Sequence, residues 1–473
     1  MSSEIDHINE PLTEHFRDRI ATVDDKGKRN WIYAYKPKGK FYNARTVLSF
    51  FYFIIFFGLP FVYINGRPMF LFNIPKGRFI IFNKVFWPQD FFIFGITMIT
   101  FIFFIILFTA AFGRLFCGWA CPQTNFMEMM FRKVEYLVLG DASAQKQLKK
   151  SPWTTKKIFK VTLKQILLYL LSFIIANFFL AYIIGIKELE KIITKPISEH
   201  TVGFFSLIIF SGVFYAVYAF FREQACTVVC PYGRLQSVLL DKNSMIVAYD
   251  YKRGEPRGNA KKNNDEQLLG DCIDCHQCVK VCPTGIDIRN GVQMECVGCT
   301  ACIDACDNIM DKINKPRGLI RYASENAIAN NEPLRYTKRM KFYTFLCLLL
   351  LGILSFLLFT RKDVDVTIMR TPGMLFQEVG KDSISNLYNL KAINKTVENI
   401  PLTIKLIDEQ GSINIIGKKY INIDKEAQGA GTFFIVLPKK AIKSRSTHLK
   451  LGLYDGEKEI TIVKTNFLGF VSE

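Results

Sequence analysis

Five long apolar stretches, two copies of a four-cysteine motif and a terminal region of short alternating segments predict the fold class of this chain. Together they predict an α-helical membrane protein with five transmembrane helices, an inserted bacterial-type two-cluster ferredoxin domain and a C-terminal β-sandwich. Half of the 473 residues are apolar and 43 are Phe, a composition typical of a membrane protein rather than of one soluble core.

The apolar stretches are each close to the roughly 20 residues that a helix needs to cross a bilayer. They run over 47–64, 91–111, 166–186, 202–221 and 342–359. The fifth contains Cys347, which we expect to pack as a small buried hydrophobe among leucines. The residues before the first stretch are polar and basic, so we expect no removable signal peptide.

The positive charge of the chain lies beside the apolar stretches and predicts their orientation. The formal net charge is +19, and loop 112–162 holds nine Lys and Arg residues against four in 65–90 and three in 187–201. Because cytoplasmic loops carry the excess of Lys and Arg, we expect 1–46, 112–162 and 222–341 on the cytoplasmic side of a bacterial inner membrane. Membrane lipid as the partner explains this charge, and we expect no nucleic-acid binding.

Residues 366–473 differ from the rest of the chain. They have no long apolar run, and they alternate apolar and polar side chains over short stretches such as 402–407, 432–437 and 449–453. Such short alternating strands predict a β-sandwich. With five spans and a cytoplasmic N-terminus, this domain is expected in the periplasm.

The predicted division of the chain follows from these features. The chain is expected to begin with a basic cytoplasmic segment over 1–46, a four-helix membrane domain over 47–241 and a linker over 242–267. The ferredoxin domain over 268–325, the fifth helix over 342–359 and the sandwich over 366–473 follow. The linker assignment depends on the basic, Gly-, Asn- and Pro-rich composition of 250–267.

Eight cysteines form two copies of one spacing. Residues 272–282 and 296–306 both read C-x2-C-x2-C-x3-C, the spacing of bacterial two-cluster ferredoxins. In that arrangement the first three cysteines of a run hold one [4Fe–4S] cluster and the fourth serves the other cluster. The predicted ligands are therefore Cys272, Cys275, Cys278 and Cys306 for cluster one, and Cys296, Cys299, Cys302 and Cys282 for cluster two.

Two other interpretations of these cysteines are less favoured. Paired C-x2-C motifs also bind zinc, but zinc takes four ligands and does not need the third cysteine and the x3 gap of each run. Residues 272–276 also match the C-x-x-C-H pattern of c-type haem attachment, which would remove two ligands from cluster one. We therefore expect His276 to be a chance match or a polar neighbour of the cluster.

A shorter cysteine motif occurs twice, at the ends of two apolar stretches. Residues 117–122 read C-G-W-A-C-P after the second stretch, and residues 226–231 read C-T-V-V-C-P after the fourth. A proline disfavours helical geometry in the residue before it and can itself begin the next helix, so we expect a helix break at Cys121 and at Cys230. The two halves thus form an internal repeat whose four thiols can converge on the ferredoxin side.

These four thiols, Cys117, Cys121, Cys226 and Cys230, are candidate catalytic and metal-binding residues. The functional interpretation is a soft-metal site or a redox dithiol site, because thiolates favour Cu(I), zinc and iron–sulfur centres. The alternative is that they pack as small apolar residues. The motif occurs twice with the proline in register, which favours the functional interpretation. We find no Rossmann glycine pattern, P-loop or nucleophile elbow, so the sequence indicates no nucleotide site.

The order of these motifs resembles one family, the FixG/CcoG group, which is also called RdxA or cytochrome c oxidase accessory protein. Two C-x3-C-P motifs, a two-cluster ferredoxin and a terminal membrane span follow one another as in that family. Residues 302–313 and 315–322 are similar to its second cluster segment, and Asp307, where a generic ferredoxin has proline, fits it. The family also has an immunoglobulin-like C-terminal domain, which agrees with the sandwich over 366–473.

The resemblance implies a membrane-bound cupric reductase that supplies Cu(I) for assembly of the cbb3-type cytochrome c oxidase. Its two 4Fe–4S clusters would pass single electrons from a cytoplasmic donor. Copper would be the substrate or bound ion, and the family's partners would be a copper transporter or oxidase subunits. The place where copper is bound or reduced would be Cys117, Cys121, Cys226 and Cys230.

Two alternatives stay open. The first is an electron-transfer subunit of a quinol-linked respiratory complex, similar to the membrane ferredoxin proteins of nitrate and nitrous oxide respiration. The second is a copper-binding scaffold whose clusters are only structural.

Overall fold

The computed structural model describes residues 21–469, apart from 25, 76, 83, 259–268, 334, 374, 381, 397, 408–409, 418–419 and 443. Residues 1–20 of the predicted basic segment and 259–267 of the predicted linker therefore lie outside the described residues. The chain divides into two compact units, Met1–Gly77 with Phe92–Leu354, and Arg78–Phe91 with Ser355–Glu473. The first contains the cysteine motifs, and the second contains the terminal β-domain.

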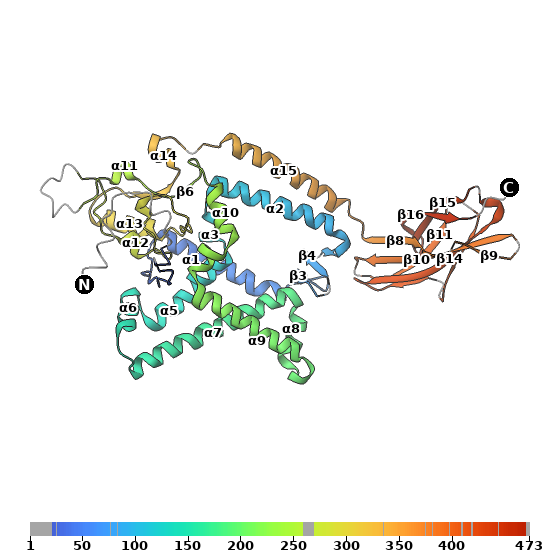
Figure 1. Cartoon of the computed structure of the whole chain (residues 1–473), viewed down its shortest axis with the longest axis horizontal. Helices are drawn as coiled ribbons and strands as arrows, with labels where there is room; N and C mark the ends of the chain where they lie inside the picture. Colours follow the sequence, from blue (N-terminus) through green and yellow to red (C-terminus); the bar gives the residue numbers. More distant parts are fainter. Residues whose placement is uncertain are drawn as a thin grey trace. The chain divides into compact units, whose positions relative to one another are not determined.

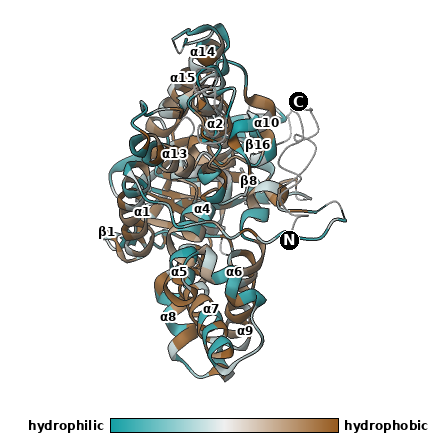
Figure 2. Cartoon of the chain, turned by 90° about the vertical axis from the view of Figure 1, so that its left-hand side faces the viewer, coloured by the Kyte–Doolittle hydropathy of each residue, from teal (hydrophilic) through white to brown (hydrophobic). Residues whose placement is uncertain are grey.

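Five helices in the described part of the chain are long and apolar enough to cross a membrane, as predicted. They are α1 (Lys40–Gly58, continued by a 3-10 turn to Phe61), α2 (Phe91–Phe112), α7 (Thr155–Ile184), α9 (Thr201–Tyr215, continued by a wide turn to Phe221) and α15 (Lys338–Phe359). The first and third begin earlier than predicted, because basic residues extend the helix beyond its apolar part. Hydrophobic residues run along α7 and α9 (Figure 2).

Aromatic contacts hold the first, third and fourth of these helices together. The Tyr182 hydroxyl of α7 donates to the Phe56 carbonyl of α1 at 2.8 Å, and the Tyr215 hydroxyl of α9 donates to Gln165 of α7 at 3.0 Å. Between them lies Phe126, which stacks on Phe53 and is only 2% exposed. Phe126 ends α4, the short helix that begins at the proline of one C-x3-C-P motif, so the core of the membrane domain also fixes the position of that motif.

Short elements connect the long helices. They are β1 (Tyr63–Ile64), β2 (Arg67–Pro68), β3 (Phe70–Asn73), α3 (Leu115–Trp119), α4 (Pro122–Phe126), α5 (Arg132–Leu139), α6 (Ala142–Lys150), α8 (Ile186–Thr194) and α10 (Pro231–Leu239).

The cysteine-rich region gathers beside the N-terminal end of α1 (Figure 1). It contains α11 (Tyr251–Gly254), α12 (Gln277–Lys280), α13 (Ala301–Lys312) and α14 (Glu325–Asn330), with strand β6 (Ile246–Tyr249) antiparallel to β7 (Ile320–Ala323). The prediction of a linker over 242–267 is therefore wrong for its described part. Val247 and Tyr249 of β6 are buried in the same core as Cys272 and Cys278, so this strand belongs to the ferredoxin fold.

The second unit is the predicted β-sandwich. One antiparallel sheet has the order β12-β14-β10-β8, with β9 also paired to β10, and the other has the order β13-β11-β15-β16. The strands are β8 (Val364–Arg370), β9 (Gln377–Val379), β10 (Ser383–Asn394), β11 (Ile400–Leu406), β12 (Ser412–Ile415), β13 (Ile421–Ile423), β14 (Gln428–Pro438), β15 (Ser446–Asp455) and β16 (Lys458–Leu468). Inward-facing residues of both sheets, including Tyr388, Phe433 and Phe467, form its core.

A buried ion pair lies at the edge of this second unit, which also includes the hairpin of β4 (Arg78–Ile81) and β5 (Lys84–Phe86). Asp90 accepts hydrogen bonds from Lys395 at 2.7 Å and from Arg361 at 2.6 Å. Burial acts to raise the pKa of Asp90, but these two cations outweigh it and hold that pKa below its usual value. The carboxylate is therefore charged and paired at neutral pH.

Candidate iron–sulfur electron-transfer site

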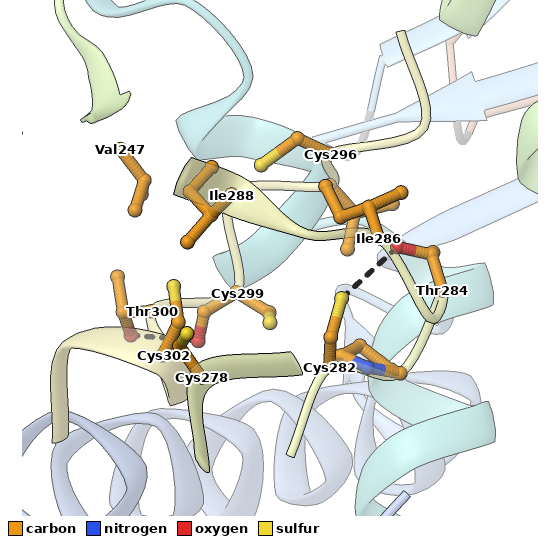
Figure 3. A pocket seen from close by; sticks show the side chains of 12 residues that line it. Val247, Cys278, Cys282, Thr284, Ile286, Ile288, Cys296, Cys299, Thr300 and Cys302 are labelled. Carbon is orange, nitrogen blue, oxygen red and sulfur yellow. Dashed lines mark hydrogen bonds between the residues drawn. The ribbon is translucent and has the colours of Figure 1, made fainter. Parts of the chain in front are cut away.

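The four cysteines predicted to hold cluster two line one hollow, together with Cys278 of the set predicted for cluster one. Figure 3 shows side chains from both cysteine runs around this hollow, which is otherwise mostly apolar. Cys282 comes from the first run, whereas Cys296, Cys299 and Cys302 come from the second. The structure thus places the fourth thiol of one run beside three thiols of the other, as the ferredoxin spacing requires.

Four left-handed residues shape the two cysteine loops in the same way. Asp274 and His276 in the first run have φ of 52° and 55°, and the equivalent Gly298 and Thr300 have φ of 67° and 62°. Each loop therefore turns sharply twice between its first three cysteines. A helix then starts, so the later cysteines of each run lie on or beside α12 and α13.

Three of the four cysteines predicted for cluster one lie in one hydrophobic core, in which Cys272 and Cys278 are buried and Cys306 packs against the buried residues. The fourth, Cys275, is partly exposed. Burial raises the pKa of Cys278 and of Cys306 to about 12. His276 contacts the Arg289 guanidinium at 2.8 Å through Nδ1, so it takes part in a polar group beside these thiols.

The donor chemistry of both cysteine sets fits an iron–sulfur cluster. Burial raises the pKa of Cys299 to about 12 and also raises that of Cys296 and Cys302, so these thiols would stay neutral at pH 7 without a metal to stabilise the thiolate. Among the described residues, no three His, Cys, Asp or Glu side chains are arranged around a single metal ion. A cubane takes three thiolates from one cysteine run and the fourth from another, and thiols of both runs line this hollow, so the donor set suits a cluster.

The two C-x3-C-P motifs have the same backbone geometry. Cys121 and Cys230 are both extended, with ψ of 126° and 113°, and each directly precedes a helix that starts at proline, α4 or α10. The Cys121 N–H donates to the carbonyl of Phe116 at 2.9 Å, and the Cys230 N–H donates to that of Ala225 at 2.8 Å. Both bonds span five residues, so each motif is one widened turn that ends at the predicted helix break.

The structure brings the thiols of the two motifs into one neighbourhood. Cys117 and Cys226 pack against the same small hydrophobic cluster, which is centred on Val297 and Cys299 of the cluster-two loop. The Cys117 thiol donates to Gln236 Oε1 of α10 at 3.3 Å, a contact between the two halves. Burial raises the pKa of Cys117 to about 11 and that of Cys226 to about 12, and the neighbouring thiols add to both shifts.

Two buried arginines join the cluster-two loop to the C-x3-C-P motifs. Arg45 of α1 donates through Nε to the Gly118 carbonyl and through Nη1 to the Cys299 carbonyl, both at 2.9 Å. Arg114 donates to the carbonyls of Met294 and, at 2.6 Å, of Gly233. Arg45 thus links the ferredoxin to the first membrane-edge turn, and Arg114 links it to the first turn of α10, which follows the second motif.

Close backbone contact completes this junction. A Cβ placed on Gly118 would overlap the carbonyl of Gly298, and a Cβ on Gly298 would lie 2.9 Å from the Arg114 carbonyl. Only glycine at these two positions lets the turn of the first C-x3-C-P motif rest directly on the cluster-two loop.

The ferredoxin also caps the first membrane helix. Asp304, on α13, accepts hydrogen bonds from the main-chain N–H groups of Phe41 at 3.1 Å and Tyr42 at 2.8 Å. These are donors of the first turn of α1, whose preceding residue, Gly39, has no side chain to cap them. The cap attaches the cysteine-rich region to the membrane domain at a second place.

Sequence reasoning identified the cysteines but missed the residues that join them. Arg45 and Arg114 lie at the ends of apolar stretches, where a basic residue indicates membrane topology and no particular contact. Gln236 lies in a short amphipathic helix without a motif, and Asp304 lies between two cysteines of the second run, whose spacing indicates only the cysteines. The sequence signal that could have indicated Gly118 is that the first motif, unlike the second, contains glycine directly after its first cysteine.

Three family models match the chain. One described as a 4Fe–4S dicluster domain matches residues 221–325, and one described as the IG-like fold at the C-terminus of FixG matches residues 354–469. A third, described as a 4Fe–4S binding domain, matches residues 94–139. These matches agree with the ferredoxin and immunoglobulin-like domains predicted from the sequence.

Several curated proteins are similar over most of the chain. Protein RdxA of Cereibacter sphaeroides is 35% identical over 338 residues, which cover 70% of this chain and 71% of that protein. Protein RdxB of the same organism is 33% identical over 72% of this chain and 73% of its own length. The nitrogen fixation protein FixG of Rhizobium meliloti is 38% identical over 56% of this chain, which spans half of that protein's length.

Proposed function

The chain belongs to the FixG/RdxA family of membrane-bound iron–sulfur proteins, and from this premise we propose that it reduces Cu(II) to Cu(I) for the assembly of a cbb3-type cytochrome c oxidase. Iron–sulfur clusters bound by the two ferredoxin cysteine sets would supply one-electron transfer. The reduction of Cu(II) to Cu(I) needs one electron, so the chemistry of donor and acceptor agrees.

One observation supports the proposal most directly. Cys299, a predicted ligand of cluster two, packs in the same small hydrophobic cluster as Cys117 and Cys226. The cysteine set predicted for electron storage therefore touches the soft thiol donors at the membrane edge. Cu(I) prefers such sulfur donors, so these thiols give a reduced copper ion a suitable environment.

We assign the reduction of copper to Cys117, Cys121, Cys226 and Cys230. Gln236 and the two arginines Arg45 and Arg114 hold the backbone turns that carry these thiols.

The proposed orientation and partners follow from the charge of the loops. The cysteine-rich region lies in the cytoplasm with its electron donor, and the β-sandwich lies in the periplasm of the bacterial cell. There the sandwich offers a docking surface for a copper transporter or for oxidase subunits. A reporter fused after Glu473 that is active only in the periplasm tests the orientation, and activity only in the cytoplasm would contradict it.

The test of the function uses the purified full chain under anaerobic conditions. The protein is reduced with dithionite, excess reductant is removed, and Cu(II) is added with a Cu(I)-specific chelator. We expect the iron–sulfur absorption to return to its oxidised form while the Cu(I) complex appears in matching amount.

A four-serine variant of Cys117, Cys121, Cys226 and Cys230 should reduce with dithionite and then lose most Cu(II) reduction. Cys347→Ser is the matched control, because this thiol is buried in α15 away from the motifs. Unchanged Cu(II) reduction in the four-serine variant would show that these thiols are not the site of copper reduction. Reduced clusters that stay reduced with Cu(II) present would favour the quinol-linked alternative.

A further inference from the structure

We infer that Cys117, Cys121, Cys226 and Cys230 together hold a third iron–sulfur cluster, of the 4Fe–4S type, at the membrane edge. This site rests on the proposed function and specifies the role of the four thiols there: as cluster ligands they would pass an electron to Cu(II) from the cluster instead of binding the copper ion themselves. Its iron content, however, does not depend on copper being the electron acceptor.

The first argument is the way in which two halves of the chain build one site. Each half supplies two thiols from a widened turn that ends at an extended Cys before a proline-initiated helix. The Cys117–Gln236 hydrogen bond joins the two turns. Cys226 lies close enough to Cys117, Cys121 and Cys230 to interact electrostatically with each of them. Four cysteines from two equivalent turns are the complete ligand set of one cubane.

The second argument is the position of the thiols beside the ferredoxin. Cys117 and Cys226, one from each half, pack against the small hydrophobic cluster that contains Cys299, a predicted ligand of cluster two. A cluster held there would lie beside cluster two, from which it could receive single electrons.

The third argument is that buried donors lack an acceptor. Gln236 is fully buried, and it accepts from the Cys117 thiol through Oε1. Two buried donors of the described residues have no hydrogen-bond partner: Nε of Arg114 and Nε2 of Gln123, which follows Cys121 by two residues. An unpaired buried donor costs about 1–3 kcal/mol. Cluster sulfur is anionic and accepts N–H groups, so a cluster at the four thiols would satisfy such donors.

The fourth argument comes from the extent of one family match. The model described as a 4Fe–4S binding domain covers residues 94–139. The cysteines in that range are Cys117 and Cys121, and none of the eight ferredoxin cysteines lies within it. One half of the proposed ligand set therefore carries a 4Fe–4S signature independently of the ferredoxin motif.

Iron and acid-labile sulfide, counted per chain in the anaerobically purified full protein without added copper, test this site. Three clusters predict about twelve iron atoms and twelve sulfides per chain, against about eight of each for the ferredoxin clusters alone. Replacing one thiol of each half, in Cys117→Ser/Cys226→Ser, should lower the count to about eight. Cys347→Ser is the matched control and should keep the full count.

The electron paramagnetic resonance spectrum of the dithionite-reduced protein provides a second readout. In the double variant the signals of clusters one and two should persist, which shows that the ferredoxin has folded. Should the variant not fold, the wild-type iron count and the number of spins per chain still decide the question. About eight iron atoms in the wild type, or no loss of iron in a folded double variant, would overturn the inference.

These outcomes separate this inference from the proposed function. Copper found at the four thiols with about eight iron atoms per chain would overturn the third cluster and leave copper reduction standing. If the chain holds about twelve iron atoms but Cu(II) does not oxidise its reduced clusters, the third cluster is supported and the proposed function is contradicted.

Discussion

The guanidinium of Arg45 donates from Nη1 to the carbonyl oxygen of Cys299 at 2.9 Å, across 254 residues of sequence. The same side chain donates from Nε to Gly118, next to Cys117. A single buried cation of the first membrane helix therefore sits between a predicted ligand of cluster two and the first membrane-edge motif. Its charge and its hydrogen bonds can be tested separately.

Arg45→Met should lower the reduction potential of cluster two. The substitution removes a positive charge beside an anionic cluster, so an added electron is less stabilised. We expect a fall on the order of 30–60 mV, up to about tenfold in a one-electron equilibrium. A redox titration followed by electron paramagnetic resonance measures it.

Two further variants give this prediction its control. Arg45→Lys keeps the charge but cannot reproduce the planar two-carbonyl contact, so it should restore part of the potential. Lys40→Met removes an exposed cation from the same helix and should leave the potential unchanged. Equal shifts in the Arg45 and Lys40 variants would show that general charge, not the Arg45 contact, sets the potential.

Gly118→Ala should separate the first C-x3-C-P turn from the cluster-two loop. The added Cβ would overlap the Gly298 carbonyl, which is backbone and cannot swing away. Overpacking of this kind costs about 1–3 kcal/mol, and we expect a lower unfolding temperature and slower Cu(II) reduction. The unfolding temperature is read from loss of iron–sulfur absorption in detergent.

Gly95→Ala is the matched control for that variant. Gly95 is also helical, in α2, but a Cβ there would meet nothing within 4 Å. Both substitutions gain the same helix propensity, so the difference between them isolates the clash. Equal stability and equal Cu(II) reduction in the two variants would mean that the turn and the loop need not touch.

The sequence was sufficient for features that depend on local spacing. Hydropathy placed the five membrane helices, and the gap lengths of the two cysteine runs predicted that Cys282 serves with the second run; in the structure Cys282 and Cys278 both line the hollow of that run. The Cys-Pro steps at Cys121 and Cys230 correctly predicted helix breaks, because proline acts directly on its neighbour.

Features that depend on distant partners could not be predicted in this way. Strand β6 is four residues long, and it pairs with β7 more than seventy positions later, so its own pattern looked like the start of a linker. Arg45, Arg114 and Gln236 make contacts 73 to 254 residues away. A single buried polar residue does not alter the periodicity of a helix, so the sequence does not indicate which distant residue it contacts.

Asp304→Ala should destabilise the junction between the ferredoxin and α1. The variant leaves the N–H groups of Phe41 and Tyr42 without their acceptor. Loss of a helix N-cap costs about 1 kcal/mol, up to about 2, and thermal unfolding of the full chain should shift down accordingly. The iron content should stay at the wild-type value, because Asp304 is not a predicted ligand.

Asp311→Ala provides the comparison on the same helix. Asp311 pairs with Arg317 at 2.7 Å on the exposed face of α13, where ion pairs contribute little. We expect no measurable change in the unfolding temperature. A larger loss in Asp311→Ala than in Asp304→Ala would argue against the capping role.

The stability of the β-sandwich unit should depend on the charge of Asp90. Burial alone would raise the pKa of this carboxyl, but the hydrogen bonds from Arg361 and Lys395 hold it below its usual value. A carboxyl with a lowered folded pKa stabilises the folded state above its unfolded pKa, roughly 3.9. That contribution is lost as the pH falls through the pKa that Asp90 has in the folded state. The pH-dependent loss of stability is therefore confined to the acidic side of about pH 5.

Asp90→Asn removes this titration and leaves two cations with a weaker partner. At pH 7 we expect a loss of about 1–3 kcal/mol, smaller than for a fully enclosed pair because Lys395 keeps its contact with Asp365. Hydrogen exchange of peptides from β8 and β10 in the full chain measures this loss of local stability between pH 3 and 7.

Glu378→Gln, which weakens an exposed ion pair with Lys439 in the same unit, is the control and should leave the stability of the unit nearly unchanged. If the wild type and Asp90→Asn lose protection in parallel as the pH falls, another group carries the acid sensitivity.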